Sequence, residues 1–275
     1  VQREHEGGED DLGHSLLSLG DVLGEQGKFR EALEKYEEVR DGFVKQLEHE
    51  TDPVKQDRCR LQISAALQGI GVVNFQQGKY DEALAKLQES YRINAQVLGP
   101  ESDTLPARLI NMGNVYRRQG KLSEARRSLK EGLRIARKKP KDDRVASIRN
   151  SLGNVYFVQG KHSQALKHYE EGLRIERTVV GKDHPRLAAS IRNIGLVYEA
   201  QEKLPESLEA LEEVLRIEKK MLGSEHPSVA CTLRSVARVH FGQGKLSEAL
   251  KGFEEALRIS LKALGEQHPD VERNL

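Results

Sequence analysis

Apolar residues recur along this chain at the three- and four-residue spacing of amphipathic helices. One stretch shows the pattern on both sides of Gly160, where the apolar positions are Leu152, Val155, Tyr156, Ala165, Leu166, Tyr169, Leu173 and Ile175. The glycine and the lysine after it interrupt the pattern, as is typical of a turn that ends one helix and opens the next. The pattern therefore predicts two helices joined at Gly160, which we call helix A and helix B.

This helix pair recurs six times. A Gln-Gly-Lys string, or Gln-Glu-Lys in one copy, places its lysine at positions 28, 79, 121, 161, 203 and 245, at intervals of 51, 42, 40, 42 and 42 residues. Seven residues before the central residue stands Gly20, Gly71, Gly113, Gly153, Gly195 or Ala237, and five after it Ala32, Ala83, Ala125, Ala165, Ser207 or Ala249. Small residues at these marks predict close helix crossings, about 8–10 Å between axes.

Three connections that follow a helix B carry a glycine followed by His-Pro. They run over 181–185, 223–227 and 265–269, and such a pattern predicts the end of one helix and the start of the next. The connection 138–143 has lost this pattern, and we expect it to be tighter or differently capped.

The second repeat has an unusual spacing. Pro53 and Gly71 are 18 residues apart, against 10 for Pro185 and Gly195. Helix A of this repeat is therefore predicted to be two turns longer, about 12 Å. Its side chains would pack against repeat 1 on one face and stay wet on the other. The alternative is a separate short helix with a kink.

The segment from Leu152 to Tyr169, L-G-x-V-Y-x-x-Q-G-K-x-x-x-A-L-x-x-Y, resembles the tetratricopeptide repeat. The 42-residue period with G-x-x-H-P between units is similar to the longer variety in kinesin light chains and nephrocystin-like proteins. Departures are Leu23 and Asn74 in place of tyrosine, and Glu202 in place of the turn glycine.

The resemblance implies an all-α fold, a right-handed superhelical α-solenoid of six helix-turn-helix units plus the start of a seventh. We expect a single array over 1–275, an excerpt of a longer protein. The expected repeats are 10–50, 53–99, 103–139, 143–181, 185–223 and 227–265, with a partial seventh at 269–275.

Composition excludes several classes. Hydrophobic residues make up 37% and charged residues 32% of the 275, too apolar for a disordered chain and too polar for a membrane protein. The net charge of +1 provides no overall field for nucleic acid or an anionic membrane. The two cysteines, Cys59 and Cys231, suggest neither a disulfide framework nor a zinc site, and we expect reduced core thiols in a cytoplasmic protein.

The histidines do not form a predicted metal site. His184, His226 and His268 are 42 residues apart, so they lie at least about 8–10 Å from one another, whereas a shared zinc needs each nitrogen near about 2 Å. His162 and His168 fall on different helical faces. No nucleophile elbow, phosphate loop or metalloprotease motif occurs. We therefore predict a protein that is not an enzyme and has no cofactor or metal.

In the family that the chain resembles, A helices line a concave groove. The resemblance implies that the groove contains Asn111, Asn114, Arg117 and Arg118 in repeat 3, Asn150 and Asn154 in repeat 4, Arg192 and Asn193 in repeat 5, and Arg234 and Arg238 in repeat 6. Amides grip an extended backbone and arginine binds carboxylates. A family clamp for C-terminal carboxylates is incomplete here, because Asn150, Cys231 and Ser235 occupy the places of its cations.

The predicted function is a protein-interaction scaffold or adaptor that binds an extended or helical partner segment in this groove. The groove arginines favour an acidic partner, because the glutamate pairs at 170–171, 212–213 and 254–255 fall on helix B and not in the groove. An arginine follows the first glutamate of each pair by four residues, and this spacing predicts an ion pair along helix B. The alternatives are a regulatory array of a larger enzyme or nucleotide-binding switch, and a nucleic-acid-binding solenoid. The 42-residue period and the balanced charge disfavour the last. We predict no nucleic-acid and no membrane partner.

Overall fold

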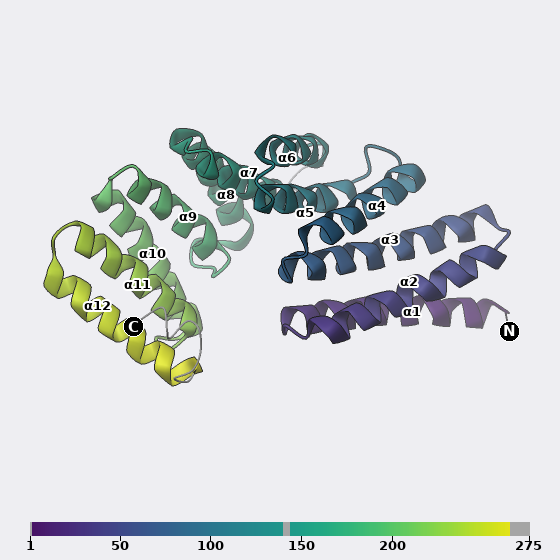
Figure 1. Cartoon of the computed structure of the whole chain (residues 1–275), viewed down its shortest axis with the longest axis horizontal. Coiled ribbons are helices and arrows are strands. Elements are labelled where there is room, and N and C mark those ends of the chain that lie inside the picture. The colour runs from purple at the N-terminus through teal and green to yellow at the C-terminus, as the bar shows by residue number, and fades with distance from the viewer. Residues whose placement is uncertain (1, 140–143, 265–275) are drawn as a thin grey trace. The chain divides into compact units, whose positions relative to one another are not determined.

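The computed structural model describes residues 2–139 and 144–264. These residues form twelve α-helices and no strand (Figure 1). The helices are α1 (Gln2–Glu25), α2 (Phe29–His49), α3 (Pro53–Gln76), α4 (Tyr80–Leu98), α5 (Leu105–Arg118), α6 (Leu122–Ala136), α7 (Arg144–Val158), α8 (His162–Val180), α9 (Leu187–Ala200), α10 (Leu204–Leu222), α11 (Pro227–Gly242) and α12 (Leu246–Leu264). The predicted all-α fold of helix pairs is confirmed. His268, most of the 138–143 connection and the partial seventh repeat lie outside the described residues.

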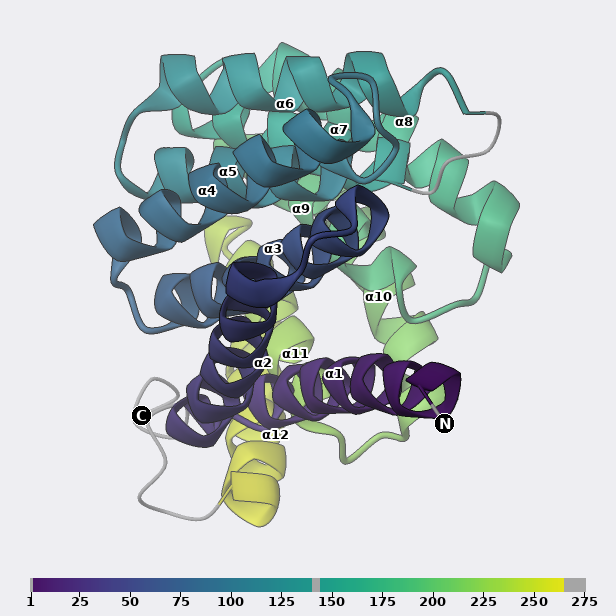
Figure 2. The same ribbon diagram turned by 90° about the vertical axis from the view of Figure 1, so that its right-hand side faces the viewer.

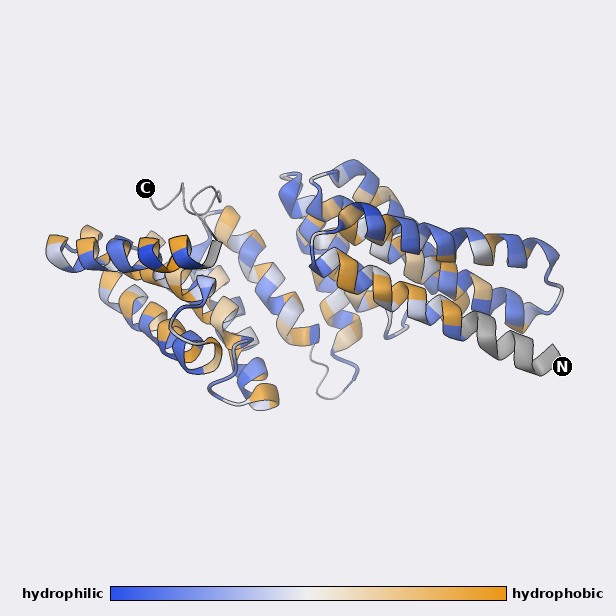
Figure 3. Ribbon diagram, turned by 90° about the horizontal axis from the view of Figure 1, so that it is seen from below, coloured by the Kyte–Doolittle hydropathy of each residue, from blue (hydrophilic) through white to orange (hydrophobic). Residues whose placement is uncertain are grey.

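The chain forms two compact units, residues 1–144 and 145–275, which hold α1 to α6 and α7 to α12. Within each unit, helices that follow one another in sequence lie side by side. For example, α2 packs against α1 and α3 (Figure 2), and α10 packs against α9 and α11. In the first unit α3 also touches α5 and α1, so successive A helices are neighbours. Apolar residues face the helix contacts, and hydrophilic residues cover the outer faces (Figure 3).

The small residues of the repeat lie at close helix contacts, as the sequence predicts. A Cβ at Gly20 would lie 2.7 Å from a ring carbon of Tyr36, and one at Gly153 would lie 2.5 Å from the ring of Tyr169. At Gly71 a leucine side chain occupies the same space, again 2.7 Å away. These separations are shorter than carbon atoms tolerate, so helix A approaches helix B this closely only where the side chain is missing.

Helix α3 is one continuous helix of 24 residues, against 14 in α9. The predicted lengthening of helix A in repeat 2 is confirmed, and the alternative of a kinked separate helix is wrong. Asp52 caps the helix by accepting the amide of Val54 at 2.8 Å. In the added turns Val54 is 78% exposed, whereas Cys59 is 2% exposed and packs in one cluster with Phe43 of α2. Helix α1 is also 24 residues long and begins at Gln2, earlier than the predicted start of repeat 1.

Left-handed backbone conformations end the helices. In the turn between helix A and helix B, Gly160 has a φ of 69°, and Glu202 takes the equivalent place in repeat 5 with a φ of 61°. Among the described residues, Glu202 is the one residue other than glycine with a positive φ. Between repeats, Gly181 and Gly223 end α8 and α10 with φ of 83° and 90°, and Pro227 is the first residue of α11.

Two of the three regularly spaced histidines are part of these connections. The Nδ1 of His184 accepts the amide of Arg186 at 3.1 Å, and the Nδ1 of His226 accepts the amide of Ser228 at 3.2 Å. Pro185 lies in the turn, since α9 begins two residues later. Both histidines therefore order the entry of a helix A.

Ion pairs join helix B to the connection that precedes helix A of the same repeat. Arg134 and Lys138 donate to Glu101 at 2.8 and 2.7 Å. These hydrogen bonds, first from Arg134 and then from Lys138, lower the pKa of Glu101 to about 2. The equivalent sets are Arg216 and Lys220 with Asp183, and Arg258 and Lys262 with Glu225. The predicted pairs of Arg216 and Arg258 with the glutamates four residues earlier are wrong, because the connection carboxylates draw these guanidinium groups away.

Candidate functional site

Helix α5 presents three polar residues on one face. Asn111 and Asn114 are half-buried and Arg118 is exposed, and the spacing of three and four residues aligns them along the helix. Within residues 2–139 and 144–264, no hydrogen bond to these three side chains is found, so their donors and acceptors are open to a partner. Arg117, the fourth predicted residue of α5, is half-buried.

A hollow of about 240 Å³ lies between α1 and α3. It is lined by Leu17, Asp21, Tyr36, Ala65, Gln68, Gly69 and Val72. Gly69 lets the ring of Tyr36 pack against α3 at the wall of the hollow, because a Cβ there would clash with the ring. The Tyr36 hydroxyl donates to Asp21 at 2.6 Å, and burial together with this bond raises the pKa of Tyr36. Positions 69 and 72 are 42 residues before Asn111 and Asn114, so the hollow and the asparagines lie at equivalent places on neighbouring helices.

We call these residues of α1, α3 and α5 the A face of the first unit: Asp21, Glu25, Gln68, Gly69, Val72, Asn111, Asn114 and Arg118. Asp21 and Glu25 are exposed at its α1 end, and Arg118 is exposed at its α5 end. The face therefore changes from acidic to basic across three helices.

In the second unit Arg192 belongs to an internal polar network. Its Nη2 donates to Glu218 at 2.7 Å and to the Thr232 hydroxyl at 3.0 Å, and that hydroxyl donates to the other oxygen of Glu218 at 2.7 Å. Glu218 is 3% exposed, and the Arg192 side chain is 32% exposed. Arg192, which the sequence analysis assigns to partner binding, thus neutralises a buried carboxylate of helix B through its guanidinium.

Asn150 belongs to an equivalent network one repeat earlier. Its Nδ2 donates to Glu176 at 3.2 Å and to Ser190 at 2.7 Å, and Ser190 donates to Glu176 at 2.7 Å. Glu176 is buried. The three residues are each 42 positions before Arg192, Glu218 and Thr232. The network therefore repeats, with a neutral amide in one copy and a guanidinium in the next. Asn150, predicted as a groove residue, is half-buried and donates to internal partners.

The remaining predicted residues of the second unit differ in whether their side chains form hydrogen bonds within the protein. Asn154 accepts the Tyr169 hydroxyl at 2.7 Å through Oδ1, and Arg238 donates twice to Glu199 at 2.8 Å. Asn193 is half-buried, and no hydrogen bond to its side chain is found in the described residues; Arg234 is half-buried. Of the five predicted groove arginines, Arg192 and Arg238 already hold glutamates.

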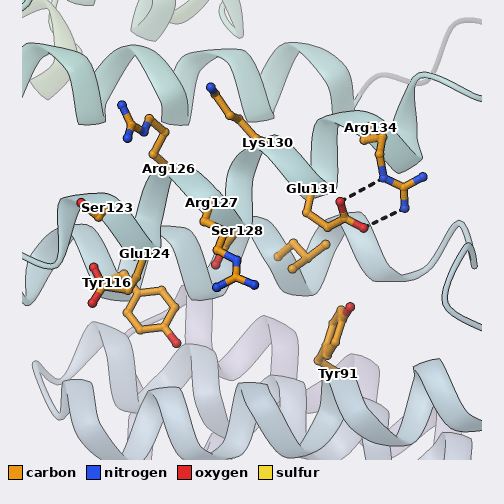
Figure 4. A pocket seen from close by; sticks show the side chains of 11 residues that line it. Tyr91, Tyr116, Ser123, Glu124, Arg126, Arg127, Ser128, Lys130, Glu131 and Arg134 are labelled. Atoms are coloured by element: carbon orange, nitrogen blue, oxygen red, sulfur yellow. Dashed lines mark hydrogen bonds and ion pairs between the residues drawn. The ribbon is translucent and has the colours of Figure 1, made fainter.

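A larger groove of about 880 Å³ lies over the other side of α5, between α4 and α6. It is lined by Tyr91, Leu109, Tyr116, Ser123, Glu124, Arg126, Arg127, Ser128, Lys130, Glu131 and Arg134. Figure 4 shows Arg127 extending toward the side of Tyr91 and Tyr116, whereas Arg126 and Lys130 point the opposite way. The Tyr116 hydroxyl accepts from Gln88 at 3.0 Å.

The described residues contain no group of three or more His, Cys, Asp or Glu side chains arranged to hold a metal ion. Cys59 is buried and Cys231 is half-buried, so the expectation of a core thiol fits Cys59 better. None of the helices in the described ranges is long and apolar enough to cross a membrane.

Comparison with known families decides the classification. A model described as tetratricopeptide repeat matches residues 62–138, 144–220 and 193–262, and a second model of that description matches residues 17–97. The chain belongs to the tetratricopeptide repeat family. No curated protein sequence matches it.

Solved tetratricopeptide structures align with most of this array. BtubC (BKLC) from P. vanneervenii gives a TM-score of 0.72 at 20% identity, covering 88% of this chain and 94% of that one. A putative kinesin light chain from Podosopora anserina gives 0.62 at 25% identity, covering 76% and 97%. The Rap conjugation gene regulator of plasmid pLS20, in complex with the Phr* peptide, gives 0.61 at 16% identity, covering 91% and 75%. The predicted resemblance to kinesin light chain-like tetratricopeptide proteins is confirmed.

Two features of this tetratricopeptide array escaped the sequence analysis. The hollow of the A face depends on Gly69, a second glycine two residues before the repeat glycine Gly71, and this doubling is its signal in the sequence. The groove beside α6 is lined by the cations Arg126, Arg127 and Lys130. The net charge of +1 for the whole chain does not reveal this local excess of positive charge. Counting charge helix by helix would have found it.

Proposed function

We propose that this tetratricopeptide array is a protein-interaction scaffold that binds an extended partner segment across the A face of the first unit. The observation that carries the proposal is the set formed by Asn111, Asn114 and Arg118. These side chains are exposed or half-buried beside a hollow, and none has a hydrogen-bond partner among the described residues. The tetratricopeptide fold is typically non-catalytic. The peptide complex of the Rap regulator supports peptide binding by this fold.

The chemistry of the A face indicates what such a segment contains. Each asparagine amide offers a donor and an acceptor to an extended backbone. The hollow accepts one apolar side chain against Leu17 and Val72. Asp21 favours a basic residue at the α1 end, and Arg118 favours a carboxylate at the α5 end. Neighbouring A helices are about 8–10 Å apart, so a strand that crosses three of them needs about five or six residues.

This segment differs from the wholly acidic one that the sequence favours. Arg192 and Arg238 are held by Glu218 and Glu199, and the α1 end of the A face is acidic. A segment with a basic, an apolar and an acidic residue in that order complements the A face better than an acidic one.

The proposal is tested by selecting short peptides from a random display library on the intact chain and measuring their affinity by calorimetry. We expect selected peptides to protect α1, α3 and α5 from hydrogen exchange. Asn111→Ala with Asn114→Ala should weaken binding about tenfold or more, because backbone hydrogen bonds are lost. Lys167→Ala with Arg174→Ala, on exposed positions of α8, is the control and should leave affinity unchanged. Protection confined to other helices, or equal affinity for both double variants, would overturn the proposal.

A further inference from the structure

Helix α6 differs in charge from every other helix B. It has four arginine and lysine residues and two glutamates. In α2, α4, α8, α10 and α12 the acidic residues equal or outnumber the basic ones; α10, for example, has five glutamates and three basic residues. Helix α6 therefore differs from the helices B that carry the glutamate pairs 170–171, 212–213 and 254–255.

Three residues cause the difference. Arg126 takes a place that is leucine in the other copies, namely Leu33, Leu84, Leu166, Leu208 and Leu250. Lys130 takes a place that is Glu37, Gln88, Glu170, Glu212 or Glu254 elsewhere. Arg127 lies between them. No ion pair of Arg126, Arg127 or Lys130 is found in the described part of the chain, in contrast to Arg134, which is held by Glu131 and Glu101.

These cations adjoin an open aromatic groove. The groove of about 880 Å³ has Tyr91, Leu109 and Tyr116 on one side, and Arg127 extends toward the two tyrosines (Figure 4). Leu109 and Tyr116 lie about 140–160° around α5 from Asn111 and Asn114, at 100° per residue. The groove is thus a surface separate from the A face.

We propose that α6 and this groove bind an acidic extended segment of a protein partner, independently of the A face. One aromatic or aliphatic side chain of the segment packs against Tyr91, Leu109 and Tyr116. A neighbouring carboxylate accepts hydrogen bonds from Arg127, and further carboxylates follow Arg126 and Lys130 along the rim.

The pattern of charges favours a peptide over a nucleic acid. Glu124 and Glu131 line the same groove, on either side of the three cations in sequence. A nucleic-acid backbone carries a phosphate at every nucleotide, so some phosphates would face these glutamates. A peptide places its carboxylates at chosen positions and avoids them.

The test uses a short fluorescein-labelled peptide of Asp and Glu with one Phe and one Leu, and the same peptide with Asn and Gln in place of the acids. Anisotropy with the intact chain should show at least about tenfold tighter binding of the acidic peptide at low salt, weakening as salt screens the charges. The triple variant Arg126→Glu, Arg127→Glu, Lys130→Glu should lose this preference. The control carries three charge reversals on exposed positions of the second unit: Lys167→Glu, Arg174→Glu and Lys182→Glu.

Equal binding of the two peptides, equal loss in the triple variant and its control, or tighter binding of an oligothymidine than of the acidic peptide would overturn the proposal. Circular dichroism checks that the variants are folded, and Arg127→Gln alone replaces the triple variant if it is not. Exchanging the peptide Phe for benzoylphenylalanine locates the site: cross-links are expected at Tyr91 or Tyr116, and cross-links on α1 or α3 would refute the location. Asn111→Ala with Asn114→Ala should leave this binding intact, which separates its failure from that of the A face.

Discussion

Replacing Arg192 with alanine should lower the stability of the second unit and not only its affinity for a partner. The change removes the donor to one oxygen of Glu218, at 2.7 Å, and the donor to the Thr232 hydroxyl, at 3.0 Å. Glu218 is 3% exposed, so water has little access to the freed oxygen. Removing one partner of a buried ion pair costs about 3–5 kcal/mol. Because the Arg192 side chain is itself 32% exposed, we expect a smaller loss of about 2–4 kcal/mol.

The chain contains its own control for this network. Arg192→Asn with Thr232→Ser copies the residues of the preceding repeat, where an amide and a serine hydroxyl hold Glu176. This double variant should recover about half or more of the stability lost in Arg192→Ala, because the carboxylate regains a donor. Asn193→Ala, one residue further along α9, should change the free energy of unfolding by less than about 0.5 kcal/mol.

Urea unfolding followed by circular dichroism gives the total stability. Native-state hydrogen exchange of α9, α10 and α11 assigns the loss to the second unit, which matters because a repeat chain need not unfold in one step. The reasoning is refuted if Arg192→Ala unfolds at the urea concentration of the unmodified chain. It is also refuted if Asn193→Ala is equally destabilised.

Two further predictions concern the turn of repeat 5 and the ion pairs of the connections. Glu202→Gly should raise stability by about 0.5–1 kcal/mol, because glycine adopts the φ of 61° without strain, and Gly160→Glu should lower it by a similar amount; thermal midpoints that do not move in opposite directions would contradict this. In an NMR pH titration Glu101 should titrate at about 2, because Arg134 and Lys138 hydrogen-bond its carboxylate. Its folded-state pKa is lowered, so its stabilising contribution is present above the unfolded value of about 4.3 and is lost as pH falls through about 2; a midpoint near the unfolded value would disprove the pairing.

The backbone of the array was predictable because its causes are local. The small residues at Gly20 and Gly153 report contacts within one helix pair, and the spacing from Pro53 to Gly71 counts helical turns directly. Neither inference needs a partner from a distant part of the chain. For this reason the helix pairs and the continuous long α3 could be derived from the sequence.

The interaction partners of the polar side chains were not predictable in the same way. Arg192 meets a glutamate 26 residues away and a threonine 40 residues away, on two other helices. Glutamate is common on helix B, so the sequence does not distinguish the buried Glu218 from the exposed Glu212 of the same helix. A serine or threonine at positions 190 and 232, in otherwise apolar stretches of helix A, is the one signal that marks a buried polar partner.

Helix α5 is the shared wall of the two proposed surfaces. Asn111 and Asn114 lie on its A face, and Leu109 and Tyr116 on the groove side. Coupling between two bound segments would have to pass through a movement of this helix. Leu105 and Val115 of α5 are fully buried, with 0% exposure, and packed cores resist small displacements. A helix fixed in this way moves little when a segment binds to one side of it. The two surfaces should therefore bind their segments independently, and one array would hold two partners at once.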